Sequence, residues 1–168
     1  YLVDGTDLSG ALENILKSEI PTYKEVVIED TLSEFVDFVG DKSNITVTKT
    51  NAGGYTSTLE PGDYNANIAG KKVTVKLLNG SSLEAGATYT VSFVVKPSEE
   101  AIQKYAESGY LHKGEAGTGE TSDGQEGFRS NDSAQVSYEV NDVPDSVDYK
   151  HPVIQVPETK KISITVKK

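Results

Sequence analysis

From residue 23 the sequence reads Tyr23-Lys-Glu-Val-Val-Ile-Glu29, a short run in which apolar and charged residues interchange. Such runs, rich in β-branched and aromatic residues, are typical of a strand with one buried face. Similar runs recur along the chain, separated by Gly, Asn, Asp and Pro, which favour turns. The pattern predicts an all-β sandwich. Its strands are expected over residues 23–29, 44–50, 64–68, 72–78, 88–96, 133–140, 151–156 and 162–167.

Two segments depart from this pattern and predict helices. Residues 7–20 repeat apolar side chains at helical spacing, and Pro21 ends the segment because proline cannot continue a helix. Residues 97–106 predict a helical crossover that begins at the N-cap Ser98. Glu99 and Glu100 would occupy its first turn, where the helix dipole favours acidic side chains.

The longest stretch without strand or helix character covers residues 108–130. It contains the run Gly114-Glu-Ala-Gly-Thr-Gly-Glu-Thr-Ser-Asp-Gly124, which lacks the apolar residues that pack a segment against a core. We therefore expect a long, flexible loop here, and loops of this length are often functional.

Composition excludes several classes of protein. The 168 residues are 36% hydrophobic, enough for one main domain, and carry a formal net charge of −10. An acidic chain is a poor partner for nucleic acid or an anionic membrane surface. Nor is any stretch near the roughly 20 apolar residues that span a bilayer. The sequence has no cysteine, so disulfides, cysteine-based zinc sites and thiol nucleophiles are excluded.

The residue types that carry catalysis are sparse. His112 and His151 are the only imidazoles, and no nucleophile-elbow or zinc-hydrolase motif accompanies them. The Gly-rich run also lacks the spacing of a phosphate-binding loop. We expect no enzyme activity on a diffusible substrate, no cofactor and no metal site.

The segment from Tyr23 to Val36 resembles the opening strand of Cna-type repeat domains, which occur in adhesins and pilins of Gram-positive bacteria. Further blocks resemble that family in the same order, so the likeness extends from about Tyr23 to Val156. It implies an Ig-like, Cna-type β-sandwich. These blocks are Leu59-Glu-Pro-Gly-Asp-Tyr64, Leu83-Glu-Ala-Gly-Ala-Thr-Tyr-Thr-Val-Ser-Phe93, Gly127-Phe-Arg-Ser-Asn-Asp-Ser-Ala-Gln-Val-Ser-Tyr138 and Tyr149-Lys-His-Pro-Val-Ile-Gln-Val156.

The resemblance also implies a domain layout. Residues 1–20 resemble the last helix of a von Willebrand factor A domain, which would make them a helical remnant of an upstream domain or a lead-in from it. Residues 21–157 would form the Cna-type sandwich. Residues 158–168 resemble a linker and the first strand of a following repeat.

Many Cna-type domains form an intramolecular isopeptide bond, and the matching positions here are Lys24, Asn131 and Asp63. In this chemistry a buried, neutral lysine amine attacks the asparagine carboxamide and releases ammonia, while a buried protonated acid polarises the carbonyl. Lys24 shares a strand phase with Val26 and Ile28, which would direct its side chain into the core.

Other interpretations remain open at each position. A strand lysine is usually a solvated edge residue. Asn131 lies out of phase with Ala134 and Val136 unless a bulge intervenes, whereas Asp132 lies in phase and is an alternative acyl partner. Asp63 also fits a turn after Pro61-Gly62.

The resemblance implies an extracellular structural stalk domain of a cell-wall-anchored adhesin or pilus subunit, linked to neighbouring domains of the same polypeptide. The alternative is an adhesive domain without a cross-link that binds a host extracellular protein or glycan. Its contact surface would be the loop of residues 108–130 and exposed tyrosines.

Overall fold

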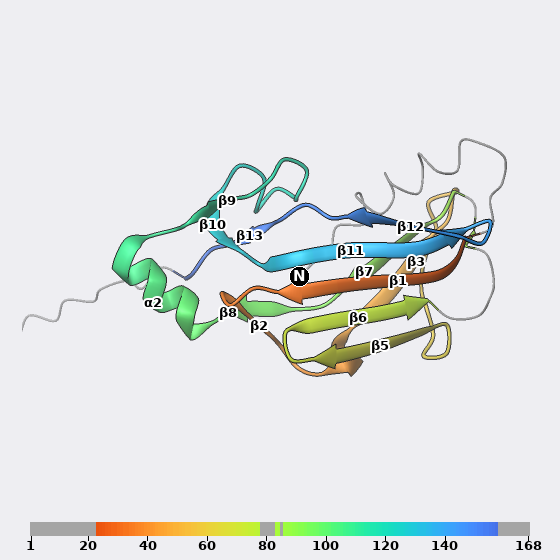
Figure 1. Ribbon diagram of the computed structural model, residues 1–168, viewed down its shortest axis with the longest axis horizontal. Helices are drawn as coiled ribbons and strands as arrows, with labels where there is room; N and C mark the ends of the chain where they lie inside the picture. The colour runs from red at the N-terminus through yellow and green to blue at the C-terminus, as the bar shows by residue number, and fades with distance from the viewer. Residues whose placement is uncertain (1–22, 78–82, 85, 158–168) are drawn as a thin grey trace, which may run out of the picture.

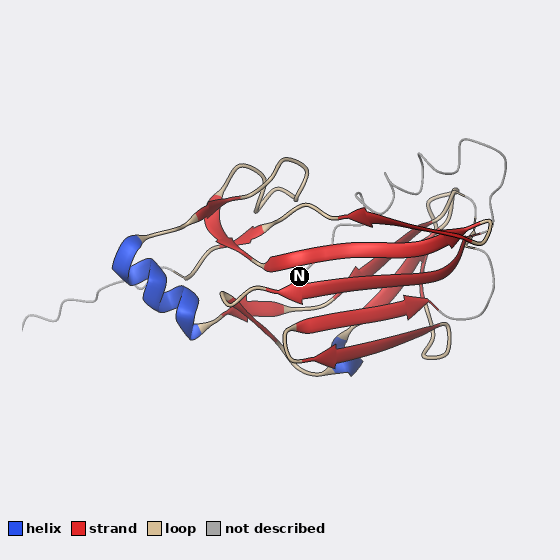
Figure 2. Ribbon diagram, in the orientation of Figure 1, coloured by secondary structure: helices blue, strands red, loops and turns tan. Residues whose placement is uncertain are grey.

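The computed structural model describes residues 23–77, 83–84 and 86–157. Two antiparallel layers form a β-sandwich, seen in Figure 1 and, coloured by secondary structure, in Figure 2. One layer has the strand order β12-β11-β1-β6-β5 and the other the order β4-β3-β7. The first layer consists of β1 (Tyr23–Leu32), β5 (Tyr64–Ala69), β6 (Lys72–Leu77), β11 (Asn131–Val140) and β12 (Val143–Asp148). The second consists of β3 (Thr46–Thr50), β4 (Thr56–Thr58) and β7 (Thr88–Ser92).

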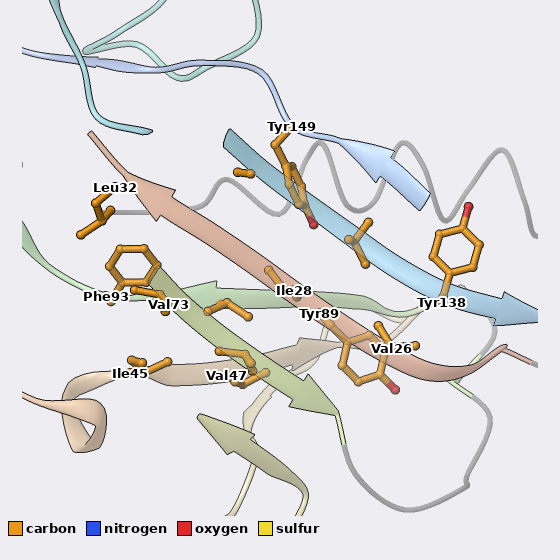
Figure 3. Close-up of a cluster of buried hydrophobic side chains, with 14 of the residues drawn as sticks. Val26, Ile28, Leu32, Ile45, Val47, Val73, Tyr89, Phe93, Tyr138 and Tyr149 are labelled. Atoms are coloured by element: carbon orange, nitrogen blue, oxygen red, sulfur yellow. The ribbon is translucent and has the colours of Figure 1, made fainter. Parts of the chain in front are cut away.

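The main core lies between these layers, as Figure 3 shows. Alternate residues of each strand point inward because successive strand side chains face opposite sides of a sheet. Ile28 of β1 and Val75 of β6 meet Val47 of β3 and Val91 of β7, and all four are buried. The prediction of an all-β sandwich is therefore confirmed.

A smaller unit packs against one end of the sandwich and carries the helix (Figure 1). Its core is a second apolar cluster in which Phe35 and Phe128 stack with ring centroids 4.6 Å apart, beside Ala101 and Val156. The elements outside the two main layers are β2 (Val36–Phe38), the 3-10 turn η1 (Lys42–Asn44), β8 (Val95–Pro97), α2 (Glu99–Ser108), β9 (His112–Lys113), β10 (Glu126–Arg129) and β13 (Val153–Ile154).

The predicted crossover helix is confirmed as α2. The Ser98 side chain accepts a hydrogen bond from the backbone N of Ala101 at 3.2 Å, so it caps the helix as expected. Gly109 ends it with φ 76°, a left-handed conformation that glycine adopts without strain. Within the described residues no helix is long and apolar enough to cross a membrane.

Several local predictions need correction. The single strand expected over residues 88–96 is divided into β7 and β8, which join different sheets. The segment expected to be a flexible loop has a defined fold: Asp123 accepts a hydrogen bond from Gly117 N at 3.0 Å, and residues 114 and 123 form a β-bridge. The first predicted helix and the last predicted strand lie outside the described residues.

Candidate functional site

Lys24, the predicted nucleophile, lies on the outside of the sandwich. A bulge between Lys24 and Val27 inserts an extra residue, and Glu25 takes φ 51° there. The bulge shifts the strand phase, so Tyr23 is buried and Lys24 is turned to solvent. The Lys24 side chain is 43% exposed, and its Nζ lies 3.2 Å from Asp142 Oδ1. The core-facing phase predicted for Lys24 is therefore wrong.

Asn131, the predicted acyl partner, lies inside. A second irregularity in the β1–β11 ladder sets Thr31 opposite Ser133 and Leu32 opposite Asn131, which leaves Asp132 without a partner on β1. This is the bulge that places Asn131 in the core, where it is 1% exposed. Asp132 is exposed, so its carboxyl group lies outside the core in which the bond would form.

The structure does not bring Lys24 and Asn131 together. Lys24 lies opposite Glu139 near the start of β1, whereas Asn131 lies opposite Leu32 at its end. At a rise of roughly 3.3 Å per residue, these two positions on β1 are about 26 Å apart. A bond between Lys24 and Asn131 is incompatible with this arrangement. None of the lysines in the described part of the chain is buried, so no other amine takes the place of Lys24.

Asp63, the predicted assisting acid, is a turn residue. Its Oδ2 accepts a hydrogen bond from Glu60 N at 3.1 Å, and its own N donates to Glu60 O at 3.0 Å. It is half-buried, directly before β5. The assignment of Asp63 as a buried catalytic acid is therefore wrong, because the Pro61-Gly62 turn holds it outside the core.

The acid that is buried in the described part of the chain is Asp30, near the end of β1. Its side chain is 2% exposed, and neither carboxyl oxygen has a hydrogen-bond partner among the described residues. Burial disfavours the charged form and raises the pKa of Asp30 to about 7. Sequence analysis missed this residue because it ended the strand at Glu29. The signal was present, since Asp30 continues the alternation of Val26 and Ile28.

Asn131 is held by the only imidazole that follows β12. His151 Nδ1 lies 3.0 Å from Asn131 Oδ1 and 3.2 Å from Asn131 O. A backbone oxygen only accepts, so Nδ1 is the donor in this contact. His151 N in turn donates to Glu115 Oε2 at 2.9 Å. These bonds join the loop of residues 114–125, the segment before β13 and the start of β11.

The two histidines, distant in sequence, come into the same region of the structure. His112 Nδ1 accepts a hydrogen bond from Arg129 N at 3.2 Å. Burial lowers the pKa of His112, and the nearby charges of Arg129 and His151 lower it further, against the opposite effect of Asp132. In the described part of the chain, no three histidine, aspartate or glutamate side chains are grouped to hold a metal ion.

The cluster of Asp30, Asn131 and His151 thus contains an acid and a carboxamide but, within the described residues, no amine to join them. Asp30 lies opposite Ala134 and Leu32 opposite Asn131, so acid and carboxamide occupy diagonal positions on neighbouring strands. The groups can donate and accept protons and hydrogen bonds. In this cluster the contact between His151 and Asn131 joins the segment before β13 to β11, whereas Asp30 makes no hydrogen bond with the described residues.

Solved structures of a similar fold include two of the major pilin subunit of Bacillus cereus, BcpA. A variant of BcpA matches with a TM-score of 0.51 and 16% sequence identity, over 80% of this chain and 30% of the pilin. BcpA itself matches with a TM-score of 0.50 and 16% identity, over 79% of this chain and 29% of the pilin. The chain thus spans less than a third of that pilin, and at this identity the likeness concerns the fold.

No curated protein matches the chain. One family model does, DUF7604, described as a domain of unknown function, and it matches residues 23–155. These residues include both layers of the sandwich, the helix and the small sheet at its end. Since the match covers most of the sequence, this chain belongs to the DUF7604 family.

Proposed function

We propose that this chain is a load-bearing structural domain of a bacterial surface fibre, in a pilus or adhesin stalk of the Gram-positive type. The similarity of the fold to part of the Bacillus cereus major pilin subunit supports a place in a surface fibre. The observation that carries the proposal is the route of the chain through the sandwich. Neighbouring domains of the same polypeptide would transmit the load.

The first strand, β1, starts at one end of the molecule, and the segment after β13 reaches the opposite end. β1 begins beside the β11–β12 hairpin, since Tyr23 lies opposite Val140. After β13 the chain reaches Val156, which packs beside Ala101 of α2 at the other end (Figure 1). Tension between neighbouring domains would therefore run along the long axis of the sandwich.

The strands that receive this tension flank one central strand. The sheet order β12-β11-β1 places β11 between β1 and β12, and both pairings are antiparallel. β1 and β12 therefore run in the same direction, and tension would pull β1 by its start and β12 by its end. This geometry shears the ladders, so many hydrogen bonds resist together instead of opening one after another.

This proposal requires no covalent cross-link between Lys24 and Asn131. Stiffness would come from the ten-residue β1, which pairs with β11 on one side and β6 on the other, and from the core beneath it. The proposal also assigns no enzymatic turnover to the domain.

Single-molecule force spectroscopy tests the proposal. The full chain is pulled through its two ends, and in a second geometry through its N-terminal end and Val143→Cys. The chain has no cysteine of its own, so this handle is unique. Val143 lies opposite Val140 and therefore at the same end of the sheet as Tyr23. The second geometry peels β1 from β11, so we expect a several-fold lower unfolding force. Equal forces in the two geometries would contradict a load-bearing role.

A further inference from the structure

An open groove of about 750 Å³ is lined by residues of α2 and of neighbouring segments. Helix α2 lies at the end of the molecule opposite the start of β1 (Figure 1). Tyr105 of α2 and Tyr110 form one part of its wall. Glu126 of β10 and Gln155, which follows β13, contribute polar groups, as does the turn around Glu120. The volume is in the range of small-molecule sites in proteins.

The two tyrosines form a fixed aromatic platform. Their ring centroids are 4.4 Å apart at an angle of 34°. Tyr110 is held from behind because its ring meets Phe128 edge-on at 5.4 Å and its hydroxyl accepts a hydrogen bond from Val156 N at 3.2 Å. Tyr105 remains 39% exposed. A ligand with an apolar face can therefore stack on Tyr105 without disturbing the core.

The polar part of the groove is rich in acceptors. Glu120 and Glu126 are exposed, and among the described residues neither carboxylate pairs with a cation. The amide nitrogen of Gln155 donates to Glu126 O at 3.0 Å, which orients the Gln155 side chain at the rim. Gln125 adds a second exposed amide. Among the described residues, no lysine, arginine or histidine belongs to the lining of this groove.

This combination selects a class of ligand. Hydroxyl groups of a ligand would donate to the carboxylates and amide oxygens, and its C–H face would cover Tyr105. The two carboxylates repel anions, which excludes phosphate and acidic sugars. We propose that the groove binds a neutral carbohydrate, a function beyond load bearing. The groove lies apart from the β1–β11 ladder, so ligand and load would act on different parts of the domain.

The test uses the full chain and an array of neutral, sialylated and sulfated oligosaccharides, with a lysine-rich peptide as an additional probe. We expect binding to one or more neutral sugars and weak or no binding to the acidic ones. The best neutral sugar is then titrated by calorimetry. Absence of binding to every neutral sugar, or a preference for acidic sugars, would overturn the proposal. Binding of the lysine-rich peptide alone would overturn it too, because the carboxylates would then serve a cationic protein segment.

Substitutions locate the binding in the groove. Tyr105→Ala removes the platform and is expected to weaken the affinity for that sugar at least tenfold. Gln125→Ala changes an exposed side chain with no hydrogen bond inside the described chain, and should weaken it several-fold without affecting the fold. Tyr55→Ala is the matched control, since Tyr55 is 71% exposed and lies between β3 and β4. Equal affinity in all three variants would place the sugar elsewhere and refute the assignment.

Discussion

His151 Nδ1 lies 3.0 Å from Asn131 Oδ1, so the imidazole of a residue after β12 forms a hydrogen bond with the first residue of β11. The same nitrogen also faces Asn131 O at 3.2 Å. Asn131 is 1% exposed, and its oxygens would lose water without gaining a donor if the ring were absent. The contact therefore joins the late segment of the chain to the central sheet.

Replacement of this imidazole should destabilise the domain. His151→Ala leaves the buried Asn131 oxygen without a donor, which typically costs about 1 to 3 kcal/mol of folding free energy. Denaturant unfolding monitored by circular dichroism measures the change. Lys113→Ala, on the exposed side of β9, serves as the control and should alter stability by less than about 0.5 kcal/mol. A His151→Ala variant as stable as the control would show that the contact contributes nothing.

Asp30 should make stability depend on pH. Its pKa is raised to about 7 in the folded state from 3.8. Between these values the folded state binds a proton that the unfolded chain has lost, so the free energy of unfolding falls as pH rises from about 4 to about 7. At 1.36 kcal/mol per pKa unit, the loss is on the order of 4 kcal/mol.

Asp30→Asn replaces the acid by a neutral side chain of similar shape and should remove this dependence, with higher stability than the wild type at pH 8. Denaturation midpoints measured from pH 4.5 to pH 8.5 test the effect. Asp132→Asn, at an exposed position on the neighbouring strand, should keep the pH profile of the wild type. A wild-type profile in Asp30→Asn would assign the pH dependence to another group.

The separation of Lys24 from Asn131 predicts an unmodified chain. The intact mass should equal the mass calculated from the sequence, whereas an isopeptide bond would lower it by about 17 Da through the loss of ammonia. Lys24→Ala should change stability by at most about 1 kcal/mol, because an exposed ion pair with Asp142 is worth little. A mass deficit that disappears in Lys24→Ala would contradict the arrangement of β1 and β11.

Ser98 should stabilise the helical end of the domain. Its side chain accepts from Ala101 N at 3.2 Å and donates to Glu34 O at 2.6 Å, so it caps α2 and ties it to the segment after β1. Loss of an N-cap typically costs about 1 kcal/mol. Ser98→Ala is expected to lower the free energy of unfolding by about that amount. Ser108→Ala, at the exposed C-terminal end of α2, is the control. Equal stability of the two variants would contradict the capping role.

Local sequence patterns were sufficient for the sandwich and for the helix. Strands such as β3, β5 and β6 were predictable because the alternation of apolar and polar residues reflects one buried face. Ser98 and the two glutamates after it marked the start of α2 because a helix end needs acceptors for its free N–H groups. Short strands such as β2 and β9 were not predicted, since a pairing of two or three residues leaves no periodic pattern.

The polar cluster depended on tertiary structure. Two irregularities in the β1–β11 ladder turned Lys24 outward and Asn131 inward, and one inserted residue exchanges the faces of every side chain on one side of it. Sequence periodicity assumes an unbroken strand and cannot locate such an insertion. His112 and His151 are separated in the chain and came together only through the pairing of β10 with β9 and β13. The sequence by itself thus determined which strands and polar residues are present. Strand register, which only the tertiary structure sets, decided whether each side chain faces the core or the solvent.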